Sequence, residues 1–150
     1  MTRRVLSSAL VPAAVDRVWE LVAAPEGIGR WAGGSLLSAE PEGPAAAGQR
    51  LHLLTSAFGL LLPVTIEVRE ADATRCRLRL VVDLPFGVAG DETIELADAG
   101  GGRTLVRLGS DLHFPPGWRG RAVLVLLARR WRRGPAASLR RLRRAAEAGR

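Results

Sequence analysis

The chain has 150 residues, of which 47% are hydrophobic and 25% are charged, and it carries a formal net charge of +7. These values are typical of one ordinary soluble globular domain over residues 1–150. A single cysteine, Cys76, excludes an internal disulfide and a cysteine-based metal site. We find no signal peptide and no apolar run long enough to span a bilayer, so a cytoplasmic protein is expected.

The first predicted element is a strand over residues 3–11. An amphipathic helix follows over residues 15–22, where apolar side chains recur at the spacing of one helix face. Pro25 and Gly27 interrupt this helix, and a short helical turn then leads to Trp31.

Six further strands are predicted downstream, and most of them alternate apolar and polar residues. In the strand at 74–84, arginines alternate with Cys76, Leu78 and Leu80, which predicts a buried thiol on the inner face. Glycines 100–102 predict a hairpin turn. Loops of hairpin length predict a curved antiparallel sheet with one wet and one dry face. The six predicted strands cover residues 36–39, 50–58, 63–71, 74–84, 91–97 and 103–114.

Residues 118–147 predict a long C-terminal helix with an apolar stripe of period 3.6. Gly134 and Pro135 should kink this helix or split it, because proline removes a backbone donor. A bent sheet that packs on such a helix often leaves a cavity between the two. The predicted stripe consists of Val123, Leu126, Leu127, Trp131, Pro135, Leu139 and Leu142.

A family resemblance supports this architecture. Residues 8–31, SALVPAAVDRVWELVAAPEGIGRW, resemble the opening of the START-like (SRPBCC) superfamily in its polyketide cyclase/dehydrase branch. The hairpin GGGRTLVRL and the PPG before the Arg-rich helix are also similar to that branch. The resemblance implies an α+β helix-grip fold, in which a seven-stranded antiparallel sheet wraps around the C-terminal helix in the order β-α-α-β6-α. It also implies binding of lipids, polyketides or other apolar small molecules, and in a minority of members their cyclisation or dehydration.

Because successive side chains on a strand point to opposite faces, we can list those that should face the cavity, and almost all of them are apolar. Such a wall fits either a ligand site or a plain core. Glu92 is the weak catalytic candidate, since a carboxyl group facing an apolar cavity has a raised pKa and can act as an acid or base. The alternative is that a bulge or a strand end turns Glu92 to solvent. The candidate ligand-binding residues are Trp31, Thr55, Leu80, Glu92, Leu108, Ser110 and Trp118.

For several of these candidates a structural role competes with ligand contact. Thr55 and Ser110 can orient a ligand, or their hydroxyl groups can bond to the backbone. Trp31 and Trp118 can line the cavity mouth, or they can pack in the core. His52 and His113 lie on the outer face without a third ligand, so no metal is expected. The sequence contains no Walker loop and no nucleophile elbow, and we expect no cofactor.

The excess charge lies in the last predicted helix. Residues 117–150 hold eleven arginines and one acidic residue, against eleven arginines and fourteen acidic residues before them. A cluster at Arg140, Arg141, Arg143 and Arg144 suggests an anionic membrane surface or an acidic partner. Nucleic acid is not expected, because aromatic residues do not alternate with the arginines. The alternative is a solvated helix face.

Two functions therefore stay open from the sequence. The first is a protein that binds an apolar small molecule between sheet and C-terminal helix, with or without cyclase/dehydrase activity. The second is a non-catalytic interaction module that uses the Arg-rich helix.

Overall fold

The computed structural model describes residues 2–57 and 59–148, and the side chains at 57 and 128–131 lie outside that description. A short 3₁₀ turn, η1 (Pro85–Gly87), joins two of the strands. The main elements in chain order are β1 (Thr2–Val11), α1 (Val15–Ala23), α2 (Pro25–Ala32), β2 (Gly34–Glu40), β3 (Arg50–Ala57), β4 (Leu60–Asp72), β5 (Arg77–Leu84), β6 (Val88–Gly100), β7 (Arg103–His113) and α3 (Gly117–Ala148).

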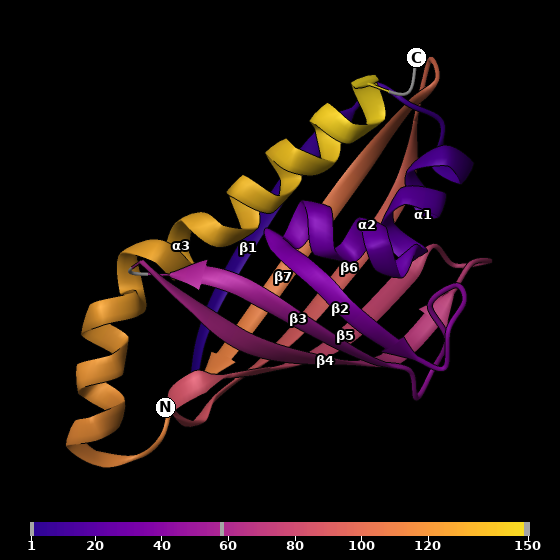
Figure 1. The fold of residues 1–150 in the computed structure, drawn as a ribbon. Coiled ribbons are helices and arrows are strands. Elements are labelled where there is room, and N and C mark those ends of the chain that lie inside the picture. The colour runs from indigo at the N-terminus through magenta and orange to yellow at the C-terminus, as the bar shows by residue number, and fades with distance from the viewer. Residues whose placement is uncertain (1, 58, 149–150) are drawn as a thin grey trace.

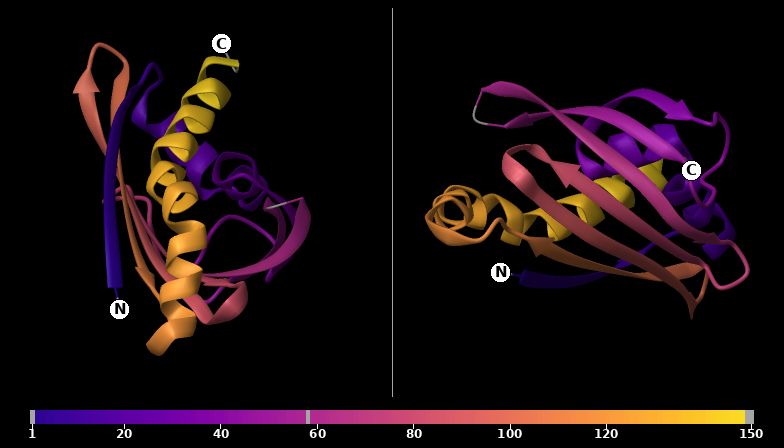
Figure 2. Two further views of the ribbon diagram at one scale, coloured as in Figure 1. Left: turned by 90° about the vertical axis from the view of Figure 1, so that its left-hand side faces the viewer. Right: turned by 90° about the horizontal axis from the view of Figure 1, so that it is seen from below.

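The strands form one antiparallel sheet in the order β1-β7-β6-β5-β4-β3-β2. Figure 1 shows this sheet curving around α3, and both views in Figure 2 place α3 along one face of the sheet. The helix-grip prediction is therefore confirmed, together with the order of its elements.

Local turn chemistry sets where the strands end. Glycines 100–102 all have positive φ, a conformation that costs glycine little, so the chain reverses between β6 and β7. Before β5, the carboxylate of Asp72 accepts hydrogen bonds from the amides of Thr74 and Arg75 at 3.0 and 3.1 Å. Because of this turn, β5 begins only at Arg77.

Cys76 therefore lies in the turn and not in the strand, which corrects the sequence prediction. Its backbone is left-handed (φ 53°), and its thiol, which is half-buried, donates to the carbonyl of Ala73 at 3.4 Å. Partial burial raises the pKa of this thiol, and nearby acidic residues add to the effect. Cys76 is thus held mainly as an unreactive thiol.

The core fills one end of the concave face. Val18 of α1 and Ile28 of α2 are fully buried there, and Leu142 of α3 packs into the same cluster at 2% exposure. Buried Thr104 of β7 donates its hydroxyl to the carbonyl of Ala13 at 2.7 Å, which ties the start of α1 to the sheet. The two short helices and the second half of α3 together cover this end.

The first half of α3 follows a different course. Figure 1 shows α3 bent near its middle, where the sequence places Gly134 and Pro135, so that the first half runs beyond the main core. The predicted buried stripe is consequently wrong at Leu126, which is 67% exposed, and Val123 packs only against a small satellite cluster. The side chain of Trp131, also assigned to the stripe, lies outside the described residues.

Because the second half of α3 packs in the core and the first half does not, replacing a leucine in each half should change the free energy of unfolding by different amounts. Leu142→Ala should lower the free energy of unfolding by about 2–5 kcal/mol, because it leaves a cavity in a packed core. Leu126→Ala should change it by less than about 0.5 kcal/mol. Urea unfolding followed by circular dichroism measures both, and equal losses would contradict the division.

Candidate functional site: an apolar cavity with one carboxyl group

A cavity of about 260 Å³ lies between the sheet and α3, at the end of the concave face that α1 and α2 leave open. Its wall is mostly apolar and comes from every strand except β1, together with the end of α2, η1 and α3. Phe86 is 67% exposed and also lines the cavity, so the cavity opens to the surface beside η1. The lining residues are Ala32, Gly34, Leu53, Thr55, Leu62, Val64, Ile66, Val82, Leu84, Pro85, Phe86, Glu92, Leu108, Ser110, Leu112, Leu127, Gly134, Pro135 and Ser138.

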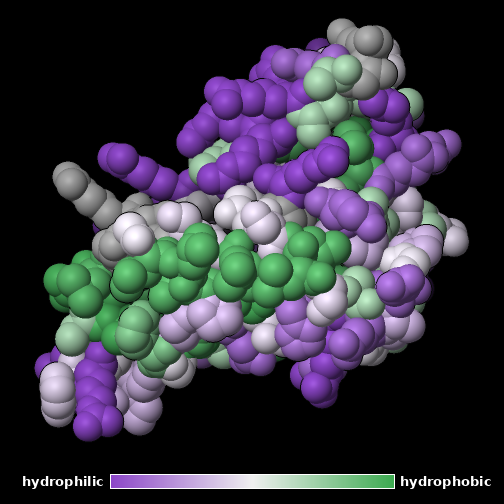
Figure 3. Space-filling view, in the orientation of Figure 1, coloured by the Kyte–Doolittle hydropathy of each residue, from purple (hydrophilic) through white to green (hydrophobic). Residues whose placement is uncertain are grey.

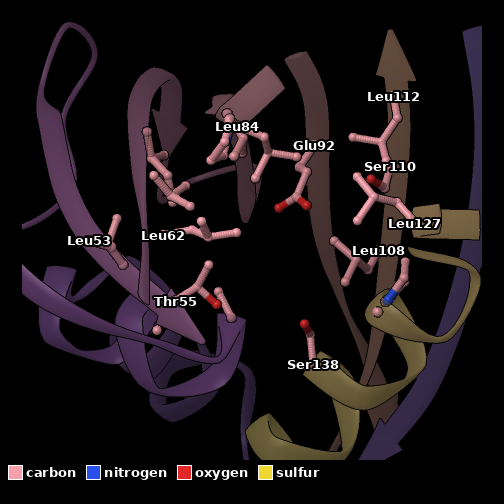
Figure 4. Close-up of a pocket in the computed structure, with 18 of the residues that line it drawn as sticks. Leu53, Thr55, Leu62, Leu84, Glu92, Leu108, Ser110, Leu112, Leu127 and Ser138 are labelled. Carbon is pink, nitrogen blue, oxygen red and sulfur yellow. The ribbon is translucent and has the colours of Figure 1, made fainter. Parts of the chain in front are cut away.

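Glu92 stands on the cavity face of β6 in unbroken strand register. It lies opposite Leu80 of β5 and opposite Ser110 of β7, and the bulge in β6 comes later, between Asp98 and Gly100. Figure 4 shows the carboxyl group pointing into the cavity. The alternative that a bulge turns Glu92 to solvent does not hold in this fold.

The surroundings of Glu92 favour its protonated form. No described residue forms a hydrogen bond or an ion pair with its carboxyl group. Burial among apolar side chains disfavours the charged form and raises the pKa of Glu92 from 4.5 to about 7. Near neutral pH this group is therefore divided between acid and carboxylate.

Three hydroxyl groups share the cavity with Glu92. Ser110 is 3% exposed and lies on the neighbouring strand, directly opposite Glu92. Thr55 donates to the carbonyl of Gly33 at 3.3 Å, as the backbone-bonded alternative predicted. Ser138 of α3 faces the same space from the opposite side (Figure 4).

Sequence reasoning missed Ser138. The available signal was its position three residues after Pro135 and four before Leu142, which places a hydroxyl group on the apolar stripe of α3. A polar residue on a buried stripe marks a place where the helix faces something other than packed side chains.

Of the seven ligand-site candidates, the structure brings four together at the cavity, namely Thr55, Glu92, Leu108 and Ser110. Leu80 does not line it. It shares a face with Glu92, but at 1% exposure it belongs to the packed core. The cavity wall on β5 begins one inward position later, at Val82.

The two tryptophans also lie away from the cavity. α2 continues to Ala32, so Trp31 turns into the core at 4% exposure, and Ala32 and Gly34 form the wall instead. Trp118 is 75% exposed on the first turn of α3, where the guanidinium of Arg119 lies 5.6 Å from its ring centre. Neither tryptophan is among the residues that line the cavity.

The arginine cluster of the second half of α3 is partly engaged within the protein. Arg141 donates to the carbonyl of Trp31 at 3.3 Å, and Arg143 pairs with Glu147 at 3.1 Å. Arg140 and Arg144 are exposed. Part of this cluster therefore anchors α3, so only part of it is available for a partner.

In residues 2–57 and 59–148, no group of three or more His, Cys, Asp or Glu is placed to hold a metal ion. His113 instead bridges Thr2 and Asp91 at 3.0 and 2.9 Å on the outer face. None of the described helices combines the length and the apolar character needed to cross a membrane.

The raised pKa of Glu92 predicts a pH-dependent stability. In the unfolded chain this carboxyl group titrates near 4.5 and in the folded chain near 7, so unfolding releases a proton between these values. Stability should fall as the pH rises from 4.5 to 7, by up to about 3 kcal/mol, and then level off. Urea unfolding should show this decline in wild type and in Glu95→Gln, on the outer face of β6, but not in Glu92→Gln. A wild-type slope that survives in Glu92→Gln would contradict it.

The sequence of this chain matches a known protein family over almost its whole length. The family model described as polyketide cyclase/dehydrase and lipid transport matches residues 2–147. No curated protein matches the sequence significantly.

Several solved structures share the fold. The Zhui aromatase/cyclase from Streptomyces sp. R1128 has a TM-score of 0.78 and 18% identity, covering 98% of this chain and 94% of its own. Norcoclaurine synthase from Thalictrum flavum has a TM-score of 0.73 and 15% identity, covering 100% and 89%. DynU16, from the dynemicin biosynthetic locus, has a TM-score of 0.64 and 25% identity, and the match spans 98% of this chain but only 48% of DynU16.

The first two likenesses are below 25% identity and show the fold alone, while the family model spans nearly the whole sequence. Through that match and its helix-grip architecture, the chain belongs to the polyketide cyclase/dehydrase and lipid transport family.

Proposed function

We propose that this protein binds an apolar small molecule, a lipid or a polyketide-like compound, in the cavity between the sheet and α3. We further propose that Glu92 acts there as an acid and base in a cyclisation or dehydration. Family membership supports the class of ligand, and the cavity supports the place.

The observation that carries the proposal is a single carboxyl group, that of Glu92, in a mostly apolar wall. A packed core has no use for a group whose charged form is costly to bury, whereas a ligand site needs a few placed polar groups. Glu92 and Ser110 lie side by side on β6 and β7, and Ser138 faces them from α3. Polar atoms thus approach one space from two directions.

A pKa of about 7 suits acid–base catalysis, because both forms of the group are present at neutral pH. As a carboxylate, Glu92 can take a proton from a carbon flanked by carbonyl groups, which leaves an enolate. That carbon can then attack a second carbonyl carbon of the same ligand, which closes a ring and leaves an alkoxide. The protonated Glu92 can return its proton to this oxygen, and a later loss of water completes a dehydration.

The volume of the cavity limits the size of the part of the ligand that it can enclose. Small-molecule sites usually span about 300–1,000 Å³, and this cavity of about 260 Å³ lies just under that range. We infer that the enclosed part of the ligand is a small apolar group, and that the remainder leaves through the opening beside Phe86.

Filling the cavity tests the binding proposal. Leu62→Trp places an indole into the lined space, and Leu61→Trp is the matched control, since Leu61 is 70% exposed and lies outside the lining. A neutral apolar fluorescent probe, N-phenyl-1-naphthylamine, should lose about tenfold or more in affinity with Leu62→Trp because its space is occupied. The control should bind as wild type does. Equal binding by both variants would rule out this cavity as the probe site.

Replacing Glu92 tests the catalytic part separately. Glu92→Gln keeps the size of the side chain and removes its proton transfer, so probe binding should persist. Turnover of a poly-β-ketone thioester should fall by about 10²–10⁴-fold, as measured by product chromatography. Full turnover in Glu92→Gln would remove the acid–base role and leave the binding proposal intact.

A further inference from the structure

The first half of α3, residues 117–133, exposes an apolar stripe. Trp118, Val125 and Leu126 are 75%, 78% and 67% exposed, and together with Ala122 they follow one helix face at positions i, i+4, i+7 and i+8. Large apolar side chains that are exposed singly are ordinary, but a contiguous set on one helix face marks an interaction surface.

Exposed apolar side chains also surround the cavity opening. Leu127 of α3 and Leu62 of β4 line the cavity, while their neighbours Leu126 and Leu61 project outward at 67% and 70% exposure. Phe86 both lines the cavity and stands 67% exposed. Figure 3 shows apolar side chains in a band that runs from the first half of α3 across the strands beside it. We call Leu60, Leu61, Phe86, Trp118, Val125 and Leu126 the mouth rim.

The charge on the α3 and β3–β4 parts of the mouth rim is positive, whereas the exposed Asp83 and Asp91 flank Phe86 in the sequence. Arg119, Arg121, Arg132 and Arg133 are exposed on this half of α3, and no acidic residue occurs between positions 112 and 146 or between 43 and 66. The guanidinium carbon of Arg119 lies 5.6 Å from the centre of the Trp118 ring, so a cation stands next to an exposed aromatic side chain. This combination of apolar anchors flanked by arginines is typical of helices that lie in an anionic membrane interface.

We propose that the mouth rim docks on an anionic lipid surface, with the cavity opening toward the bilayer. Apolar side chains from α3, the β3–β4 hairpin and η1 would insert, and the flanking arginines would meet lipid phosphates. A nucleic acid would use the arginines but would leave these apolar side chains without partners. The surface role does not depend on catalysis by Glu92.

Vesicle sedimentation tests the proposal with full-length protein. Wild type should bind vesicles of equimolar phosphatidylcholine and phosphatidylglycerol, and should not bind phosphatidylcholine alone. Leu61→Ser combined with Leu126→Ser should weaken binding about tenfold or more, since apolar anchors are lost. Arg119→Glu combined with Arg121→Glu should do the same through charge.

Two matched double variants serve as controls. Leu6→Ser with Leu10→Ser removes exposed leucines from β1, an edge strand that is separated from β4 by β7, β6 and β5. Arg140→Glu with Arg144→Glu makes the same charge change about 30 Å further along α3, beyond the screening length of about 10 Å at 0.1 M salt. Both controls should bind within about threefold of wild type, and circular dichroism confirms that each variant is folded.

Several results would overturn the proposal. The first is that the wild-type protein does not bind anionic vesicles. The second is that either control variant loses as much binding as the test variants do. A third is a dimer that Leu61→Ser with Leu126→Ser converts to monomer, because the rim would then be an interface between copies. A fourth is tight duplex DNA binding that depends on Arg119 and Arg121 but not on Leu61 and Leu126.

Discussion

The packing of the second half of α3 into the concave face of the sheet is the constraint on which the other features depend. Leu139, Leu142 and Ala146 are almost fully buried in this contact, and Arg141 adds a hydrogen bond to the end of α2. Because α1, α2 and this half of α3 fill one end of the curved sheet, the other end is incompletely filled, and the cavity lies there between the strands and α3. The bend near Pro135 then directs the first half of α3 past that end, so that Leu127 and Gly134 line the cavity without filling it. The cavity, its opening and the exposed helix face all result from this single division of the concave face.

The environment of Glu92 results from this division of the concave face. The residue occupies a regular place in β6, away from the bulge between Asp98 and Gly100, and its half-buried side chain faces the cavity. The desolvated carboxyl group has a pKa of about 7, and the hydroxyl groups of Ser110 and Ser138 share its space. The family covers both polyketide cyclases/dehydrases and lipid transport, and a catalytic role for Glu92 is our proposal from geometry.

Strand alternation predicted an antiparallel sheet with one apolar face, and the family resemblance implied the helix-grip fold. The alternation assigned Thr55, Glu92, Leu108 and Ser110 to that face, and all four line the cavity. It failed at Leu80 because parity identifies a face and not the part of the face that helices cover. Trp31 and Trp118 depend on how far α2 and α3 extend, which periodicity does not specify. Ser138 was missed although it lies on the apolar stripe of α3, because periodicity does not show which turn of the helix faces the cavity.

Native mass spectrometry of freshly purified protein tests the central claim, that the space beside Glu92 is a ligand site, most directly. The account predicts an adduct with the mass of an apolar small molecule in wild type and in Leu61→Trp. The same adduct should be absent from Leu62→Trp and should dissociate when the protein is unfolded. An adduct retained in full by Leu62→Trp, or bare protein mass in every sample together with no probe binding, would contradict it.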